Sequence, residues 1–178
     1  MTTMPDSLPL LARMTVESYV ARGILPDLPP DLLPAFRAQQ AGVFVTLYHT
    51  PGPQRGLRGC IGTIAPTQPN ILEETRQNAV SAAVRDPRFR PVSESELPGL
   101  IYEVSVLHEP EPISGLEQLN VDLYGVIVTH AGRRGLLLPG IESIRTVQEQ
   151  VSHAMYKAGI RPGEPISLFR FQVDKYAE

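Results

Sequence analysis

The fold of this chain is organised around the stretch Leu57-Arg58-Gly59-Cys60-Ile61-Gly62-Thr63, which holds the only cysteine among the 178 residues. Gly59 precedes the cysteine directly, and Gly62 follows it by two positions. Glycine inside a strand-like run is typical of a bulge, a bend, or a close approach by another backbone or a ligand. Arg58 can bring a cation near the thiol, which would favour the thiolate. The stretch therefore predicts a strand of unusual shape around one sulfur atom.

The residues before this stretch predict its pairing partner. Val43-Phe44-Val45-Thr46-Leu47-Tyr48 is β-branched or aromatic at most positions, which is typical of a buried strand. Residues 49–56 contain two prolines and two glycines and predict a long hairpin loop. We therefore expect the cysteine stretch to return as the strand that pairs with Val43 to Tyr48.

Capping and periodicity signals place the remaining elements. The predicted helices are Leu8 to Arg22, a short one around Ala35 to Gln40, Asn70 to Arg85, and one from Thr146 to Ala158. The other predicted strands are Ile101 to Leu107, Gly125 to His130, Arg133 to Leu138 and Ile166 to Val173. Strands that follow one another as hairpins favour an α+β fold, with a mainly antiparallel sheet flanked by helices.

Composition excludes several classes of protein. The chain is 42% hydrophobic and 20% charged, which is typical of a globular protein, and its net charge of −3 argues against nucleic-acid binding. One cysteine cannot form an internal disulfide, and the four histidines show no metal-ligand spacing, so we predict no metal and no cofactor. No apolar run is long enough to span a membrane, and the start of the sequence shows no secretory signal. We therefore expect a cytoplasmic protein with no membrane contact.

From about Leu8 to Tyr176 the chain resembles the AMMECR domain family. Besides the cysteine stretch, the segments that carry the resemblance are Gly42 to Leu47, Asn78-Ala79, Ala82-Ala83, Asp86 to Phe89, Leu97-Pro98, Ser105 to Leu107, Tyr124 to Val126, Gly135 to Pro139 and Lys157 to Ile160. The resemblance implies one AMMECR-like domain over residues 1–178, with a larger and a smaller lobe and the cysteine stretch near a groove between them. Prokaryotic members resemble the A component of the AmmeMemoRadiSam grouping, which implies a Memo-like and a radical-SAM protein as partners.

Cys60 is the candidate nucleophile. A nucleophilic thiol needs a base or a thiolate-stabilising cation within hydrogen-bond reach, and the candidates are Arg58, His49 and His153. The alternative is a buried thiol that serves as a small apolar side chain. The sequence leaves both interpretations open.

A second candidate group lies on the predicted helix that begins at Thr146. Gln150, His153 and Lys157 are three and four positions apart and therefore share one helix face. This face is either solvated or one wall of a polar groove. The resemblance supports Gln150 and Lys157 more than His153, which remains the weaker catalytic candidate.

A third candidate group follows the predicted helix that ends near Arg85. Asp86 and Arg88 either order the loop locally or form an anion-binding corner. Glu103 interrupts an apolar strand and needs a partner if it is buried, for which we expect Arg88. The pair Arg133-Arg134 at a predicted hairpin is interpreted as surface charge rather than as a phosphate clamp.

Together these observations predict a small-molecule enzyme or enzyme subunit with a polar groove centred on Cys60. Arg58 would stabilise the thiolate or an anion, and the bound molecule would be small and anionic because the basic residues are mostly arginine. The predicted binding residues are Arg58, Gly59, Gly62, Asp86, Arg88, Glu103, Gln150 and Lys157. The alternative is a non-catalytic binding or delivery module that works with the Memo-like and radical-SAM partners.

Overall fold

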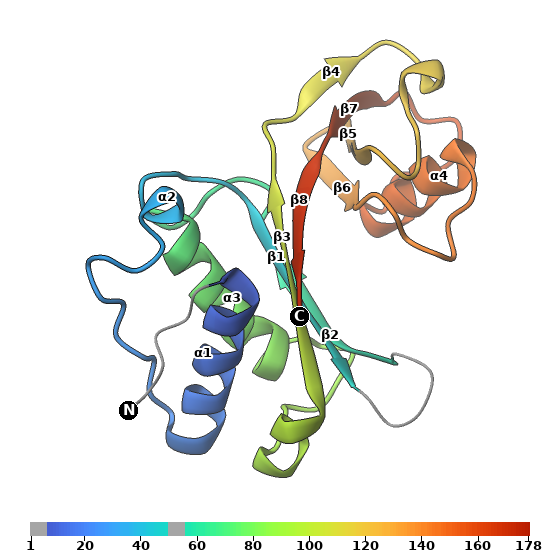
Figure 1. The fold of residues 1–178 in the computed structure, drawn as a ribbon. Helices are drawn as coiled ribbons and strands as arrows, with labels where there is room; N and C mark the ends of the chain where they lie inside the picture. The colour runs from blue at the N-terminus through green and yellow to red at the C-terminus, as the bar shows by residue number, and fades with distance from the viewer. Residues whose placement is uncertain (1–6, 50–55) are drawn as a thin grey trace. The chain divides into compact units, whose positions relative to one another are not determined.

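The structure is a computed structural model that describes residues 7–49 and 56–178 (Figure 1). The predicted hairpin loop lies largely outside these residues. The described chain divides into two compact units. Unit 1 comprises residues 7–49, 56–106 and 175–178, and unit 2 comprises residues 107–174. Each unit has its own antiparallel sheet and its own apolar core.

Unit 1 is a four-stranded sheet with helices on one face. Its elements are α1 (Leu8–Arg22), α2 (Pro34–Arg37), β1 (Val43–His49), β2 (Gly56–Gly62), α3 (Ile71–Val84), the 3-10 helix η1 (Glu94–Gly99), β3 (Leu100–Leu107) and β8 (Val173–Ala177). The strand order is β2-β1-β3-β8. The predicted pairing of Val43 to Tyr48 with the cysteine stretch is confirmed, with Thr46 opposite Cys60.

The core of unit 1 lies between this sheet and the helices α1 and α3, which lie side by side in Figure 1. Val45, Leu47 and Tyr102 are fully buried there. α1 begins where the Ser7 side chain accepts a hydrogen bond from the Leu10 N–H, and it ends at Gly23 with φ 68°. Both ends agree with the predicted helix, because they depend on local capping chemistry.

Unit 2 is a second antiparallel sheet covered by one helix. Its elements are β4 (Glu111–Ile113), the 3-10 helix η2 (Leu116–Gln118), β5 (Gly125–His130), β6 (Arg133–Leu137), α4 (Val147–Lys157) and β7 (Ser167–Phe171), in the strand order β4-β7-β5-β6. The predicted β5–β6 hairpin is confirmed. Its turn residues Ala131 and Gly132 have φ of 47° and 80°, as a type I′ turn requires.

The predicted last strand, Ile166 to Val173, is wrong in one respect. The structure breaks it at Gln172 into β7, which joins the sheet of unit 2, and β8, which joins the sheet of unit 1. Alternation of side chains continues through a bend and cannot show that a strand changes sheets. The α+β class and the antiparallel pairing are confirmed. Within the described residues, none of the helices is long and apolar enough to cross a membrane.

Candidate functional site

The main chain of Cys60 lies on the outer edge of the unit 1 sheet, because β2 is an edge strand. The Cys60 N–H donates to Asp86 Oδ2 at 2.9 Å, and Arg88 Nη2 donates to the Cys60 carbonyl at 3.4 Å. Asp86 also accepts from the Arg88 N–H at 3.1 Å, from Nε at 3.0 Å and from Nη2 at 2.7 Å. Asp86 and Arg88 therefore close the strand edge at Cys60.

Asp86 is a buried carboxylate that accepts hydrogen bonds at this edge of the sheet. Its side chain is 2% exposed, whereas that of Arg88 is 54% exposed. The hydrogen bonds from Arg88 outweigh burial and lower the Asp86 pKa from 3.8 to about 2. The Arg88 pKa is raised, mainly by these bonds and in part by its interaction with Cys60. An exposed guanidinium is thus held at the main chain of Cys60. Ordering of the loop and an anion-binding corner are therefore compatible interpretations of Asp86 and Arg88.

The Cys60 thiol lies on the face of the sheet opposite α3. Thr46 Oγ1 is 3.4 Å from Cys60 Sγ, and Thr46 is paired with Glu103 on its other side. Directly paired residues share a face, so Cys60, Thr46 and Glu103 form one row across three strands. Glu103 is 8% exposed, and Lys175 Nζ of β8 lies 3.5 Å from its carboxylate. The expected Glu103–Arg88 pair is therefore wrong.

The Arg58 side chain binds Glu96 and the main chain of Arg90. The register shift between Leu47 and Tyr48 makes Arg58 the extra residue of a β-bulge. Its Nε donates to Glu96 Oε1 at 2.7 Å, and its Nη2 donates to the Arg90 carbonyl at 2.9 Å. Arg88 therefore donates to the Cys60 carbonyl, whereas Arg58 binds Glu96 and the Arg90 carbonyl.

The two glycines of the stretch have packing roles. A Cβ at Gly59 would lie 2.2 Å from the Ala82 carbonyl oxygen of α3, and a Cβ at Gly62 would lie 2.2 Å from the Phe44 ring. Both positions are filled by the protein itself. The close approach that the two glycines predicted is therefore made by α3 at Gly59 and by the Phe44 ring at Gly62.

The predicted residues of α4 belong to unit 2 and do not share one environment. Gln150 is fully buried, and its Nε2 donates to the Tyr124 carbonyl at 2.8 Å. His153 and Lys157 are exposed, and Lys157 Nζ donates to the Leu136 carbonyl at 3.3 Å. Helical spacing predicted one polar face, whereas packing of α4 on its sheet buries its first member. A place for Gln150 and Lys157 in the groove stays a prediction.

The base that a nucleophilic Cys60 needs is not supplied by His49. His49 lies three residues beyond Thr46 on β1, which is roughly 10 Å along the strand, and strand alternation directs it to the other face. The Thr46 hydroxyl lies 3.4 Å from the sulfur. Sequence reasoning missed Thr46, Glu96 and Lys175. For Thr46 there was a signal, because the predicted pairing of Val43 to Tyr48 with the cysteine stretch brings that strand beside Cys60.

The pH dependence of the unfolding free energy tests whether the Arg58–Glu96 and Arg88–Asp86 ion pairs stabilise unit 1. The hydrogen bond from Arg58 lowers the Glu96 pKa from 4.5 to about 2, as Arg88 does for Asp86. Because both pKa values are lower in the folded state, their stabilisation is complete above about pH 5 and is lost as the pH falls towards 2. The unfolding free energy of the wild type should decrease between pH 6 and pH 2.5. In Glu96→Gln this decrease should be smaller by about 1 kcal/mol, after allowance for solvent screening.

Denaturant titrations over this pH range provide the measurement. Glu94→Gln is the matched control, because Glu94 is exposed in the same 3-10 helix. Equal pH profiles for wild type and Glu96→Gln would show that the Arg58–Glu96 pair contributes nothing to folding.

Comparison with known proteins places this chain in a family. The AMMECR1 family model matches residues 10–176. A protein of Thermotoga maritima is 46% identical over 166 residues, covering 90% of this chain and 91% of its own length. A protein of Clostridium acetobutylicum is 40% identical over 169 residues, which cover 94% of this chain and 35% of that relative. The crystal structure of an uncharacterized protein from Pyrococcus horikoshii matches with a TM-score of 0.89 at 35% identity, covering 97% of this chain and 90% of that one. The chain therefore belongs to the AMMECR1 family.

Proposed function

We propose that the chain is a small-molecule enzyme or enzyme subunit that acts on an anionic molecule at Cys60, in a polar groove over the cysteine stretch. The observation that carries this proposal is the Asp86–Arg88 arrangement at the edge of β2. Asp86 fixes the Cys60 main chain and the Arg88 guanidinium at the same point, while over half of the Arg88 side chain stays open to solvent.

The arrangement suits both parts of the proposed activity. A guanidinium near a sulfur favours the thiolate, which is the nucleophilic form of cysteine. The Nη1 donors of the same guanidinium, which neither Asp86 nor the Cys60 carbonyl binds, can donate charge-assisted hydrogen bonds to an oxygen of a carboxylate or phosphate. Arg88 therefore takes the role that the sequence assigned to Arg58, and Thr46 is the hydroxyl that contacts the reacting atom.

Alkylation of Cys60 with two probes of different charge tests the proposal. At pH 7 the thiol should react with neutral iodoacetamide faster than glutathione does, because a larger fraction is thiolate. The ratio of the iodoacetate rate to the iodoacetamide rate should be roughly twofold to fivefold higher for Cys60 than for glutathione. Iodoacetate is an anion, and one exposed ion pair has an effect of this size. Arg88→Gln should lower both quantities, and Arg88→Lys should restore part of the charge effect.

Arg90→Gln is the control, because Arg90 is exposed in the same loop and contributes its main-chain carbonyl to Arg58. An inert Cys60, or equal effects of Arg88→Gln and Arg90→Gln, would contradict the nucleophile proposal. Mass spectrometry of the modified chain gives the rates directly, since Cys60 is its only cysteine.

A non-catalytic delivery module is the second candidate. It is favoured by the Clostridium acetobutylicum relative, in which the matched region makes up only 35% of the chain. A domain that occurs fused to further sequence is typical of one that works beside another protein. On this alternative, Cys60→Ser would leave both pathway activity and binding of a Memo-like or radical-SAM partner intact. On the enzyme proposal, the same change abolishes activity and preserves partner binding.

A further inference from the structure

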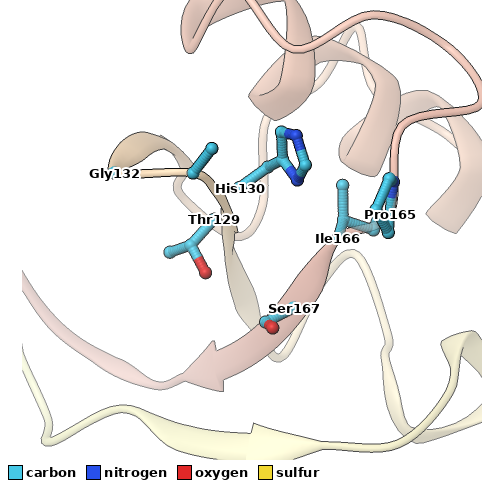
Figure 2. Close-up of a pocket in the computed structure, with 7 residues that line it drawn as sticks. Thr129, His130, Gly132, Pro165, Ile166 and Ser167 are labelled. Carbon is cyan, nitrogen blue, oxygen red and sulfur yellow. The ribbon is translucent and has the colours of Figure 1, made fainter.

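The sheet of unit 2 has an open end that the proposed function does not use. A hollow of about 310 Å³ lies there, lined by Thr129, His130, Ala131, Gly132, Pro165, Ile166 and Ser167 (Figure 2). This volume is at the lower end of the range for small-molecule sites. The hollow lies wholly within unit 2 and shares no residue with the Cys60 site.

The hollow forms because the β5–β7 ladder stops abruptly. The last pair is Thr129 with Ser167. By the same register, Ala131 would be opposite Pro165, which has no N–H to donate to the ladder. Ala131 has also left the extended conformation, with φ 47°. The two chain segments therefore separate beyond Thr129 and leave a space between them.

Three donor side chains lie in register on the strands that border this space. Thr129 is paired with Ser167 on one side and with Arg134 on the other, so these three residues form a row on one face of the sheet. Ser167 and Arg134 are exposed, and Thr129 is partly buried. Within the described chain, no hydrogen bond or ion pair occupies these three side chains. Figure 2 shows the His130 ring on the other side of β5, turned toward Ile166 and Pro165.

The two arginines of the β5–β6 hairpin, Arg133 and Arg134, have different charged neighbours. Arg133 Nη2 donates to Glu164 Oε1 at 2.8 Å, and the Arg161 N–H donates to Glu164 Oε2 at 2.6 Å. His130 Nε2 lies 3.5 Å from the same carboxylate. Glu164 thus pairs with Arg133, whereas among the described residues no carboxylate lies within ion-pair distance of Arg134. The interpretation of the pair as surface charge therefore missed the ion pair that Arg133 forms.

We propose that the open end of the unit 2 sheet binds a small anion, a phosphate or carboxylate group, through Arg134, Thr129 and Ser167. One guanidinium and two hydroxyls supply donors to the oxygen atoms of such a group, and charge-assisted hydrogen bonds of this kind are the strong ones. The hollow at the end of the ladder, which Thr129 and Ser167 themselves line, accommodates the rest of the molecule.

Titration of the ¹⁵N-labelled full chain with inorganic phosphate, and separately with acetate, tests the proposal by NMR. Saturable amide shifts should concentrate at residues 129–134 and 165–167. Arg134→Gln should weaken binding by at least about tenfold, and Thr129→Val combined with Ser167→Ala should weaken it similarly. Arg145→Gln is the matched control, because Arg145 is an exposed arginine of the same unit whose recorded contact is through its main chain. Cys60→Ser should bind with unchanged affinity.

The two probes distinguish the sources of the anion. Saturation by phosphate alone supports a phosphorylated ligand, saturation by acetate alone supports a carboxylate, and saturation by both supports a general anion site. Absence of saturable shifts with either probe overturns the proposal. Equal losses in Arg134→Gln and Arg145→Gln also overturn it, because binding would then follow net charge rather than this row of residues.

Discussion

Gly59→Ala should destabilise unit 1 by about 3 kcal/mol, the upper end for overpacking of a well-packed interior. The added Cβ would lie 2.2 Å from the Ala82 carbonyl oxygen and 3.1 Å from its carbon, and both atoms belong to the main chain of α3. Neither can move like the end of a flexible side chain, so α3 or β2 must shift as a whole. Denaturant unfolding followed by circular dichroism gives the change in free energy.

Gly56→Ala is the matched control in the same strand. A Cβ at Gly56 meets no described atom within 4 Å, so the change should stay within about 0.5 kcal/mol. If both variants are equally stable, α3 does not pack against β2 as closely as the structure indicates. Cys60 alkylation in Gly59→Ala should also change, because the strand that carries the thiol is the one displaced.

Asp86→Asn should produce the second large effect, a loss of about 2–3 kcal/mol of unfolding free energy. The amide keeps one acceptor for the Cys60 N–H but loses the charge that binds Arg88 at 2.7 and 3.0 Å. Asparagine does not titrate, so the variant should also lose the Asp86 part of the acid sensitivity between about pH 5 and pH 2. Denaturant titrations at pH 7 and pH 3 measure both effects.

Asp27→Asn serves as a control, because Asp27 is an exposed carboxylate of unit 1. A stability loss at pH 7 that persists unchanged at pH 3 would show that Asp86 acts through shape rather than through its charge. Slower alkylation of Cys60 in Asp86→Asn, with normal folding, would connect the ion pair to the thiol and support the proposed function.

Local chemistry explains why much of the fold could be predicted. α1 is bounded by Ser7 and Gly23, and α4 begins with the reciprocal hydrogen bonds of Thr146 and Glu149. The β5–β6 hairpin follows from two turn residues that lie in the left-handed region. The sheet change between β7 and β8 has no such local signal, and it depends on tertiary packing.

The candidate site was less predictable because its contacts join distant parts of the chain. Asp86 and Arg88 are two residues apart, and a loop carboxylate commonly binds a nearby donor. Their connection to Cys60 depends on where the loop meets the edge of β2. The partners of Arg58 and Glu103 are Glu96 and Lys175, and no periodicity relates either pair. Gln150 illustrates the same limit, since helical spacing shows a shared face but not which part of it is buried.

The transfer of the chain from β7 to β8 has a consequence for the order in which the two units fold. Residues 107–174 of unit 2 are continuous in sequence, whereas unit 1 needs residues 175–178 to complete its sheet. Glu178 also binds Arg13, at 2.7 Å from both Nε and Nη2. Contacts between residues far apart in the sequence close large loops and form late. During refolding from denaturant, unit 2 should therefore become resistant to protease before unit 1.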